Sequence, residues 1–165
     1  MAHGMLGLLQ RQTPDGSAIG WDEIVVGHDF GLLDADEIQA WILGTGTQGP
    51  ACAELAGAAS RDRFEERLWA ACAEVTGKAP RPGGRRWAKA QDRWRVALLK
   101  DILEAPLSAE ALAVAVEAVY ERVGCPEDML DLWKRPDRWE RRPATADRSV
   151  VAAFLRRKDD ERVSA

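Results

Sequence analysis

Helical periodicity is the feature that most limits what this chain can fold into. Apolar residues recur three, four and seven positions apart along most of its 165 residues, and no segment alternates as a half-buried strand would. One stretch shows the spacing clearly, through Phe64, Leu68, Ala71, Cys72 and Val75. The sequence therefore predicts an all-α fold.

Capping residues, glycines and prolines divide this pattern into seven to eight helices. Asp34, followed three positions later by Glu37, is typical of a helix start. No segment is long enough to act as a linker between domains. We therefore expect a compact single-domain array: a flexible N-terminal segment 1–19, one all-helical domain 20–158, and a frayed tail 159–165.

Three glycines match the spacing of a dinucleotide-binding loop. Gly44, Gly46 and Gly49 fall on the G-x-G-x-x-G pattern. That loop works when a strand leads into it and the next helix points its N–H groups at the phosphates. Here the preceding segment has a helical pattern, so the sequence predicts a joint between helices. We expect no cofactor.

Acidic and basic residues are segregated along the chain, whose net charge is −4. Segments 1–60 and 101–131 each carry eight acids and one base, and segment 78–100 carries eight bases and one acid. From residue 132 onward there are ten bases and six acids. Two interpretations stay open: these segments face each other in the fold, or one of them presents a single-sign patch to a charged partner.

The acids near two predicted helix starts form the first candidate site. Negative charge there complements the helix dipole, which is one explanation for it. The second is an exposed acidic patch that receives lysines and arginines of a partner protein. The candidate residues are Asp22, Glu23, Asp29, Asp34, Asp36 and Glu37.

Candidate catalytic and metal-binding residues are sparse. His28 stands beside Asp29, but no zinc-ligand spacing or nucleophile motif accompanies it, so we predict no metal site and treat an enzyme using His28 and nearby carboxylates as an alternative. Three widely spaced cysteines are typical of reduced thiols, and no apolar run is long enough to span a bilayer. We therefore expect a cytoplasmic protein without a membrane partner.

Two segments combine tryptophan with arginine. In 78–100, Trp87 and Trp94 favour a helix core over a nucleic-acid platform, because they lie seven positions apart in an acidic protein. Residues Trp133, Arg138 and Trp139 have the composition of an interface hot spot, although such a tryptophan can instead pin a loop onto the core. We include all three in the candidate partner-binding set.

Two stretches carry a resemblance to a known family. WDEIVVGHDFGLLDADEIQAWIL and WRVALLKDILEAPLSAEALAVAVEAVYERVGCPEDMLDL are similar to the two signatures of an uncharacterised bacterial family of small helical proteins, domain of unknown function 2247. The resemblance covers residues 20–133. Small, acidic helical families of this kind resemble immunity proteins that neutralise toxins, which is an argument from analogy.

These observations favour a non-enzymatic protein-binding module, with an immunity-type inhibitor of a basic toxin domain as its specific form. An acidic face would steer fast association with such a partner. The alternatives are the enzyme based on His28 and a structural or oligomerising module built on Trp133 and Trp139. Neither nucleic acid nor a small molecule is the expected partner.

Overall fold

The structure of the protein is a computed structural model that describes residues 4–13, 17–46, 48–57 and 62–164. Within these ranges the regular elements are helices, apart from one isolated β-bridge. None of the helices in these ranges combines the length and apolar character needed to cross a membrane. The predicted all-α fold is confirmed. In chain order the helices are α1 (Met5–Arg11), α2 (Trp21–Asp29), α3 (Ala35–Thr45), α4 (Pro50–Ala56), α5 (Phe64–Thr76), α6 (Arg85–Glu104), α7 (Ala109–Arg122), the 3₁₀ helix η1 (Glu127–Leu132) and α8 (Arg148–Ser164).

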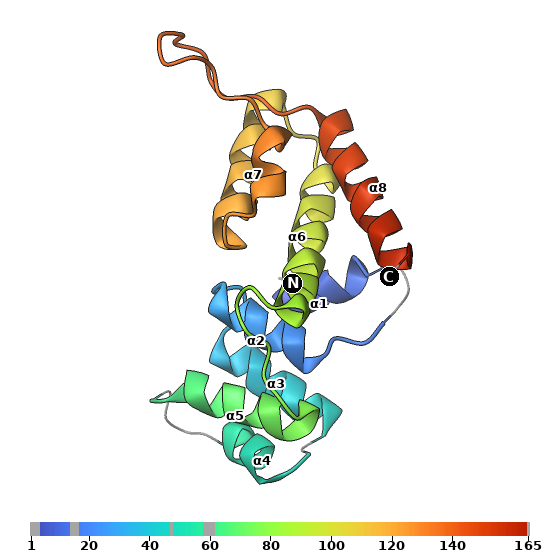
Figure 1. Cartoon of the computed structure of the whole chain (residues 1–165). Helices are drawn as coiled ribbons and strands as arrows, with labels where there is room; N and C mark the ends of the chain where they lie inside the picture. The colour runs from blue at the N-terminus through green and yellow to red at the C-terminus, as the bar shows by residue number, and fades with distance from the viewer. Residues whose placement is uncertain (1–3, 14–16, 47, 58–61, 165) are drawn as a thin grey trace.

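Helix α6 is the axis of the molecule. It has 20 residues, about 30 Å at 1.5 Å per residue, and it contacts α1, α2, α7 and α8. Helices α3, α4 and α5 gather with α2 at one end of the molecule, while α7 and α8 flank the other half of α6 (Figure 1). Each end therefore has its own group of helices, joined through α6.

The crossing of α2 over α6 is the most tightly packed part of the core. Residues 23–27 of α2 are buried without interruption, because α5 covers one side of this helix and α6 the other. Gly27 lies directly against Trp94: a Cβ added to this glycine would sit 2.7 Å from Cζ2 of the indole. The indole Nε1 donates to the Glu23 carbonyl oxygen at 2.8 Å, so the fully buried ring leaves no unpaired polar atom.

The basic segment 78–100 faces acidic segments on both sides. Arg86 binds Asp22 and Arg93 Nη1 lies 2.8 Å from Glu23 Oε1, so the start of α2 is held to α6 by two ion pairs. The segment pairs with η1 as well, as described below. The interpretation that the segregated charges face each other is thereby confirmed.

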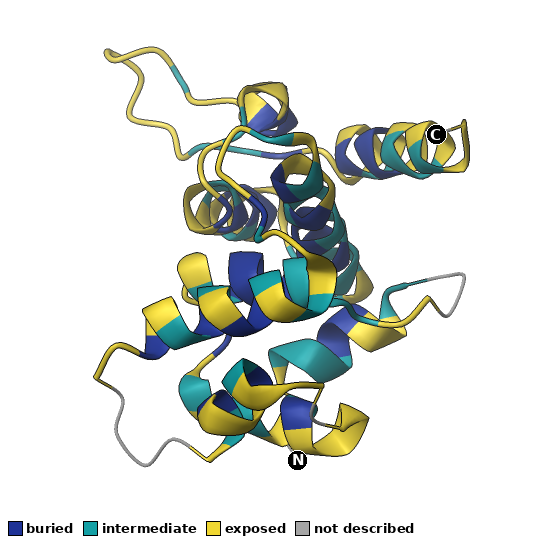
Figure 2. Ribbon diagram, turned by 60° about the horizontal axis from the view of Figure 1, so that its bottom comes forward, coloured by how far each residue is buried: buried dark blue, intermediate teal, exposed yellow. Residues whose placement is uncertain are grey.

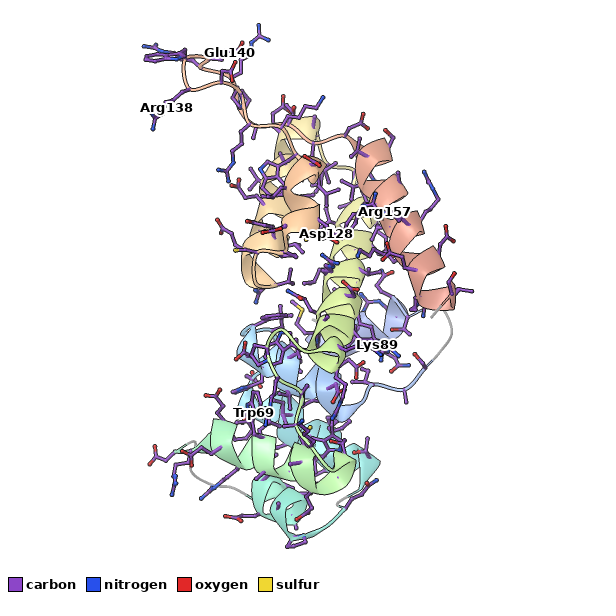
Figure 3. The ribbon with its side chains drawn as sticks, in the orientation of Figure 1. Trp69, Lys89, Asp128, Arg138, Glu140 and Arg157 are labelled. Carbon is purple, nitrogen blue, oxygen red and sulfur yellow. The ribbon has the colours of Figure 1, made fainter. Side chains whose placement is uncertain are left out.

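A cluster of charges fastens η1 and α8 to α6. Arg95 is only 4% exposed and binds Asp92 and Asp128, the latter at 2.9 Å between Nη2 and Oδ2. Lys158 Nζ lies 3.0 Å from Asp128 Oδ2, and the Phe154 ring lies beside both cations (Figure 3). Burial acts to raise the pKa of Asp128, but hydrogen bonds from Arg95 and Lys158 outweigh it and hold this pKa below its ordinary value.

The glycine-rich stretch is a joint between helices, as predicted. Gly44 lies within α3, and Pro50 begins α4. Gly46 and Gly49 have φ angles of +88° and +112°, which glycine adopts without strain. Thr47 lies outside the described residues. The strand that a dinucleotide loop requires is replaced here by a helix.

Helical structure extends beyond the expected domain 20–158 at both ends. Within the predicted flexible segment 1–19, α1 packs on α6 and buries Leu8 and Leu9, because its apolar residues have a helix face to cover. The predicted frayed tail 159–165 is helical as far as Ser164, and Lys100 Nζ lies 3.1 Å from Asp159 Oδ2.

Adding one methyl group at Gly27 tests the close contact between α2 and α6. We expect Gly27→Ala to lower the free energy of unfolding by about 1–2 kcal/mol, because overpacking costs more than the roughly 1 kcal/mol that alanine gains in a helix. Gly44→Ala is the matched control: this helical glycine has open space where its Cβ would lie, so the change should stabilise the protein slightly. Urea unfolding of both variants makes the measurement, and equal effects would contradict the packing argument.

Acidification tests the cluster around Asp128. Because the pKa of this carboxyl is lower in the folded state than in the unfolded chain, its contribution is complete above the unfolded value of about 3.9 and is lost as the pH falls through the folded value. Asp128→Asn should therefore destabilise the protein at pH 7 by about 1 kcal/mol, a value reduced by the partial exposure of Asp128. The difference from wild type should shrink as the pH falls below about 4. A difference that stays constant with pH in urea unfolding would rule out this role.

Candidate functional site

A single loop, residues 134–145, projects from the end of the molecule formed by α7, η1 and α8; we call it the arm (Figure 1). An antiparallel bridge closes its base: Lys134 N donates to Thr145 O at 2.7 Å, and Thr145 N donates to Lys134 O at 3.0 Å. At the far end, Glu140 N donates to Asp137 O at 2.8 Å and forms a turn. The arm is thus a closed loop with a defined tip.

The tip of the arm presents a tryptophan to solvent. Trp139 lies in the turn and is 92% exposed, and Arg138 beside it is exposed too (Figures 2 and 3). The arm carries five basic residues against two acidic ones, and prolines at 136 and 143 exclude a regular helix through it. A large aromatic ring in such surroundings has no core to enter, so it stays in water.

The base of the arm is fixed to α7. Trp133, which precedes the bridge, is only 6% exposed, and its ring packs against Tyr120 with 5.2 Å between centroids. The Arg135 guanidinium lies 5.9 Å from the centroid of the Trp133 ring and pairs with Glu117. Trp133 thus anchors the base of the arm, while Trp139 is the accessible ring of the two; the assignment of Trp133 to a partner surface stays a prediction.

A groove of about 620 Å³ lies at the base of the arm. The bridge residues Lys134 and Thr145 both line it, together with the end of η1 and the start of α8. Most of its apolar lining comes from Leu107, Leu132, Trp133 and Val150, and its charged lining comes from Asp131, Lys134, Asp147 and Arg148.

Two of these four charges are already engaged. Arg148 donates to the backbone carbonyl oxygens of Leu103 and of Ala105, the latter at 2.9 Å. Asp147 accepts a hydrogen bond from Ser149 N at 2.8 Å, and bonds from Ser149 lower its pKa. The side chains of Asp131 and Lys134 make no hydrogen bond or ion pair with any residue that the structure describes, although the charge of Lys134 helps to lower the pKa of Asp147.

Two residues of the predicted acidic patch serve the fold instead. Glu23 is 8% exposed, accepts from Gly20 N at 2.9 Å and pairs with Arg93. Asp22 binds Arg86, whose Nε lies 2.8 Å from Asp22 Oδ2. Both acids thus meet bases that α6 supplies, and their assignment to a partner surface stays a prediction.

The other four acids lie on α2 and α3, away from the arm (Figure 1). Asp29, Asp34 and Asp36 are exposed, and Glu37 is half-buried. Asp34 caps α3, since its Oδ1 accepts from Glu37 N at 2.8 Å. The structure therefore separates the two predicted groups of partner-binding residues and does not bring them into one site.

His28 has no carboxylate partner. It is half-buried with its ring 5.4 Å from that of Phe64, and it makes no hydrogen bond or ion pair with a described residue. Across the same residues, no three His, Cys, Asp or Glu side chains are grouped so that they could hold a metal. These side chains give no geometric support to an enzyme based on His28.

Sequence reasoning identified the tip of the arm but missed the groove. Asp131 and Lys134 lie next to each other in the sequence, but Val150 comes from α8, and the backbone bridge and the contacts of α8 with η1 bring it to them. The one signal in the sequence is the pair of prolines around a charged, non-periodic stretch, which indicates a loop without indicating what it folds against.

Tryptophan fluorescence tests the contrast between the tip and the base of the arm. The emission lost in Trp139→Phe should be that of a solvated indole, readily quenched by acrylamide, because the side chain is 92% exposed. The emission lost in Trp133→Phe should lie at shorter wavelength and resist quenching, because that ring is buried. Protection of Trp139 in the dilute protein would contradict the projecting arm.

The family pattern for uncharacterised proteins conserved in bacteria (DUF2247) matches residues 14–137. The match includes the first residues of the arm and ends two residues before Trp139. No curated protein and no solved structure matches the chain. The resemblance seen in the sequence is thereby confirmed: this chain belongs to the bacterial family of domain of unknown function 2247.

Proposed function

We propose that this chain is a non-enzymatic protein-binding module that holds its partner with the arm. The observation that carries the proposal is the position of Trp139, almost fully exposed at the tip of a loop whose base is fixed. Tryptophan and arginine dominate binding hot spots because the first removes a large apolar area from water on binding and the second forms directed hydrogen bonds. A ring of this size on an ordered loop offers a partner a large apolar area to bury.

Fixation of the base supports the proposal further. The bridge, the packing of Trp133 on Tyr120 and the Arg135–Glu117 pair order the ends of the arm before any partner arrives. A pre-ordered element loses less conformational entropy when it binds. The partner therefore meets a presented side chain and does not have to order a free loop.

The charge of the arm defines the chemistry of the partner. With five bases against two acids, it suits a protein surface that carries acidic residues around an apolar recess. An inhibitor of a basic toxin domain would need the opposite sign, and for that role only the exposed acids of α2 and α3 remain. The three cysteines are free thiols, which supports a cytoplasmic location as part of the same proposal.

Capture of partners with two matched variants tests the proposal. Trp139→Ala should weaken binding by about 30-fold or more, the effect of losing a hot-spot residue, while leaving stability unchanged because the side chain contacts solvent. Asp29→Lys with Asp36→Lys should leave the same partner bound. Calorimetry on the purified pair measures the binding of each variant. If the charge reversal abolishes binding and Trp139→Ala has no effect, the result would favour the inhibitor and contradict the role of the arm.

A further inference from the structure

The arm and the groove at its base are complementary, but one copy cannot bring them together. The groove offers an apolar lining beside Asp131 and Lys134, whose side chains have no ion pair among the described residues. The tip of the arm offers an indole between Arg138 and Glu140. Within one chain the arm projects away from the body (Figure 1), and Trp139 is 92% exposed.

We propose that two copies of this chain exchange arms, each placing Trp139 in the groove of the other. This inference rests on the proposed function and names its partner as a second copy. The groove supplies an apolar recess with the Asp131 carboxylate beside it.

The position of the groove makes the exchange geometrically simple. Lys134 and Thr145 form the bridge at the base of the arm and also line the groove, so the two binding elements lie at opposite ends of one arm. A two-fold axis beside the middle of the arm places the tip of each copy at the base of the other. An interface of this kind is isologous, with both contacts formed at once.

The size and charge of the groove suit the tip of the arm of a second copy. A volume of about 620 Å³ lies within the range of specific ligand sites and leaves room for an indole with part of its chain. The tip carries both signs of charge in Arg138 and Glu140, and the groove supplies the opposite charges in Asp131 and Lys134. Opposite charges across an interface fix its register.

Sedimentation velocity on the full chain tests the exchange. We expect a monomer–dimer equilibrium with a dissociation constant of about 1–100 μM, because two small contacts make a weak interface. Trp139→Ala and Val150→Arg should each weaken it at least about tenfold, the first by removing the ring and the second by placing a like charge in the groove against a basic arm. Val163→Arg is the matched control, since this exposed valine of α8 lies outside the groove; it should leave the dimer intact.

Mixing the two defective variants gives the decisive result. In a mixed pair, the intact arm of Val150→Arg meets the intact groove of Trp139→Ala, so one of the two contacts is restored. We expect the mixture to associate more tightly than either variant alone. A mixture no tighter than its components would overturn the exchange even if both variants fail to dimerise, and so would a wild type that stays monomeric throughout this concentration range.

The same variants separate this inference from the proposed function. A monomeric wild type whose capture of another protein depends on Trp139 overturns the exchange and leaves the binding arm standing. A dimer that forms unchanged in Trp139→Ala, together with unchanged capture, overturns both.

Discussion

Contact between Gly27 and Trp94 determines how the rest of the molecule is arranged. An indole fits between α2 and α6 only because residue 27 has no side chain, and its N–H is satisfied by the Glu23 carbonyl oxygen one turn earlier. This contact sets where α2 crosses α6, and Asp22 and Glu23 then meet Arg86 and Arg93. Helix α6 is thereby fixed as an axis, and the arm is presented at the end of the molecule away from α2.

Periodicity predicted the helices because each one buries a face, and that signal is local to its own sequence. The charge pattern could be interpreted only by comparing segments that lie far apart in the sequence. It predicted that acidic and basic segments face each other but did not identify which residues pair, such as Arg95 and Asp128, which are 33 residues apart. The N-terminal helix was missed for a related reason. Helix α1 has only seven residues, too few to show a repeat, and it is stable through Leu8 and Leu9 packing on α6.

Two tryptophans six residues apart show why the site was only half predictable. Trp133 and Trp139 have similar neighbours in the sequence, and composition gives both the look of an interface. Their roles diverge because the Trp133 ring packs on Tyr120, whereas the chain beyond Lys134 leaves the body of the molecule and returns to it only at Thr145. Which ring is covered depends on tertiary contacts, and a single sequence does not encode these in any local pattern.

The two ends of the molecule differ in how their charged residues are paired. Near α2 and α3, Asp22 and Glu23 pair with α6 and Asp34 caps α3, whereas Asp29 and Asp36 are exposed. Among the described residues of the arm, Arg135 pairs with the body through Glu117, whereas Arg138 lies at the projecting tip (Figure 3). Net positive charge and an unburied indole therefore coincide at one place, and a surface of both kinds gains most from a partner that supplies carboxylates and an apolar recess together.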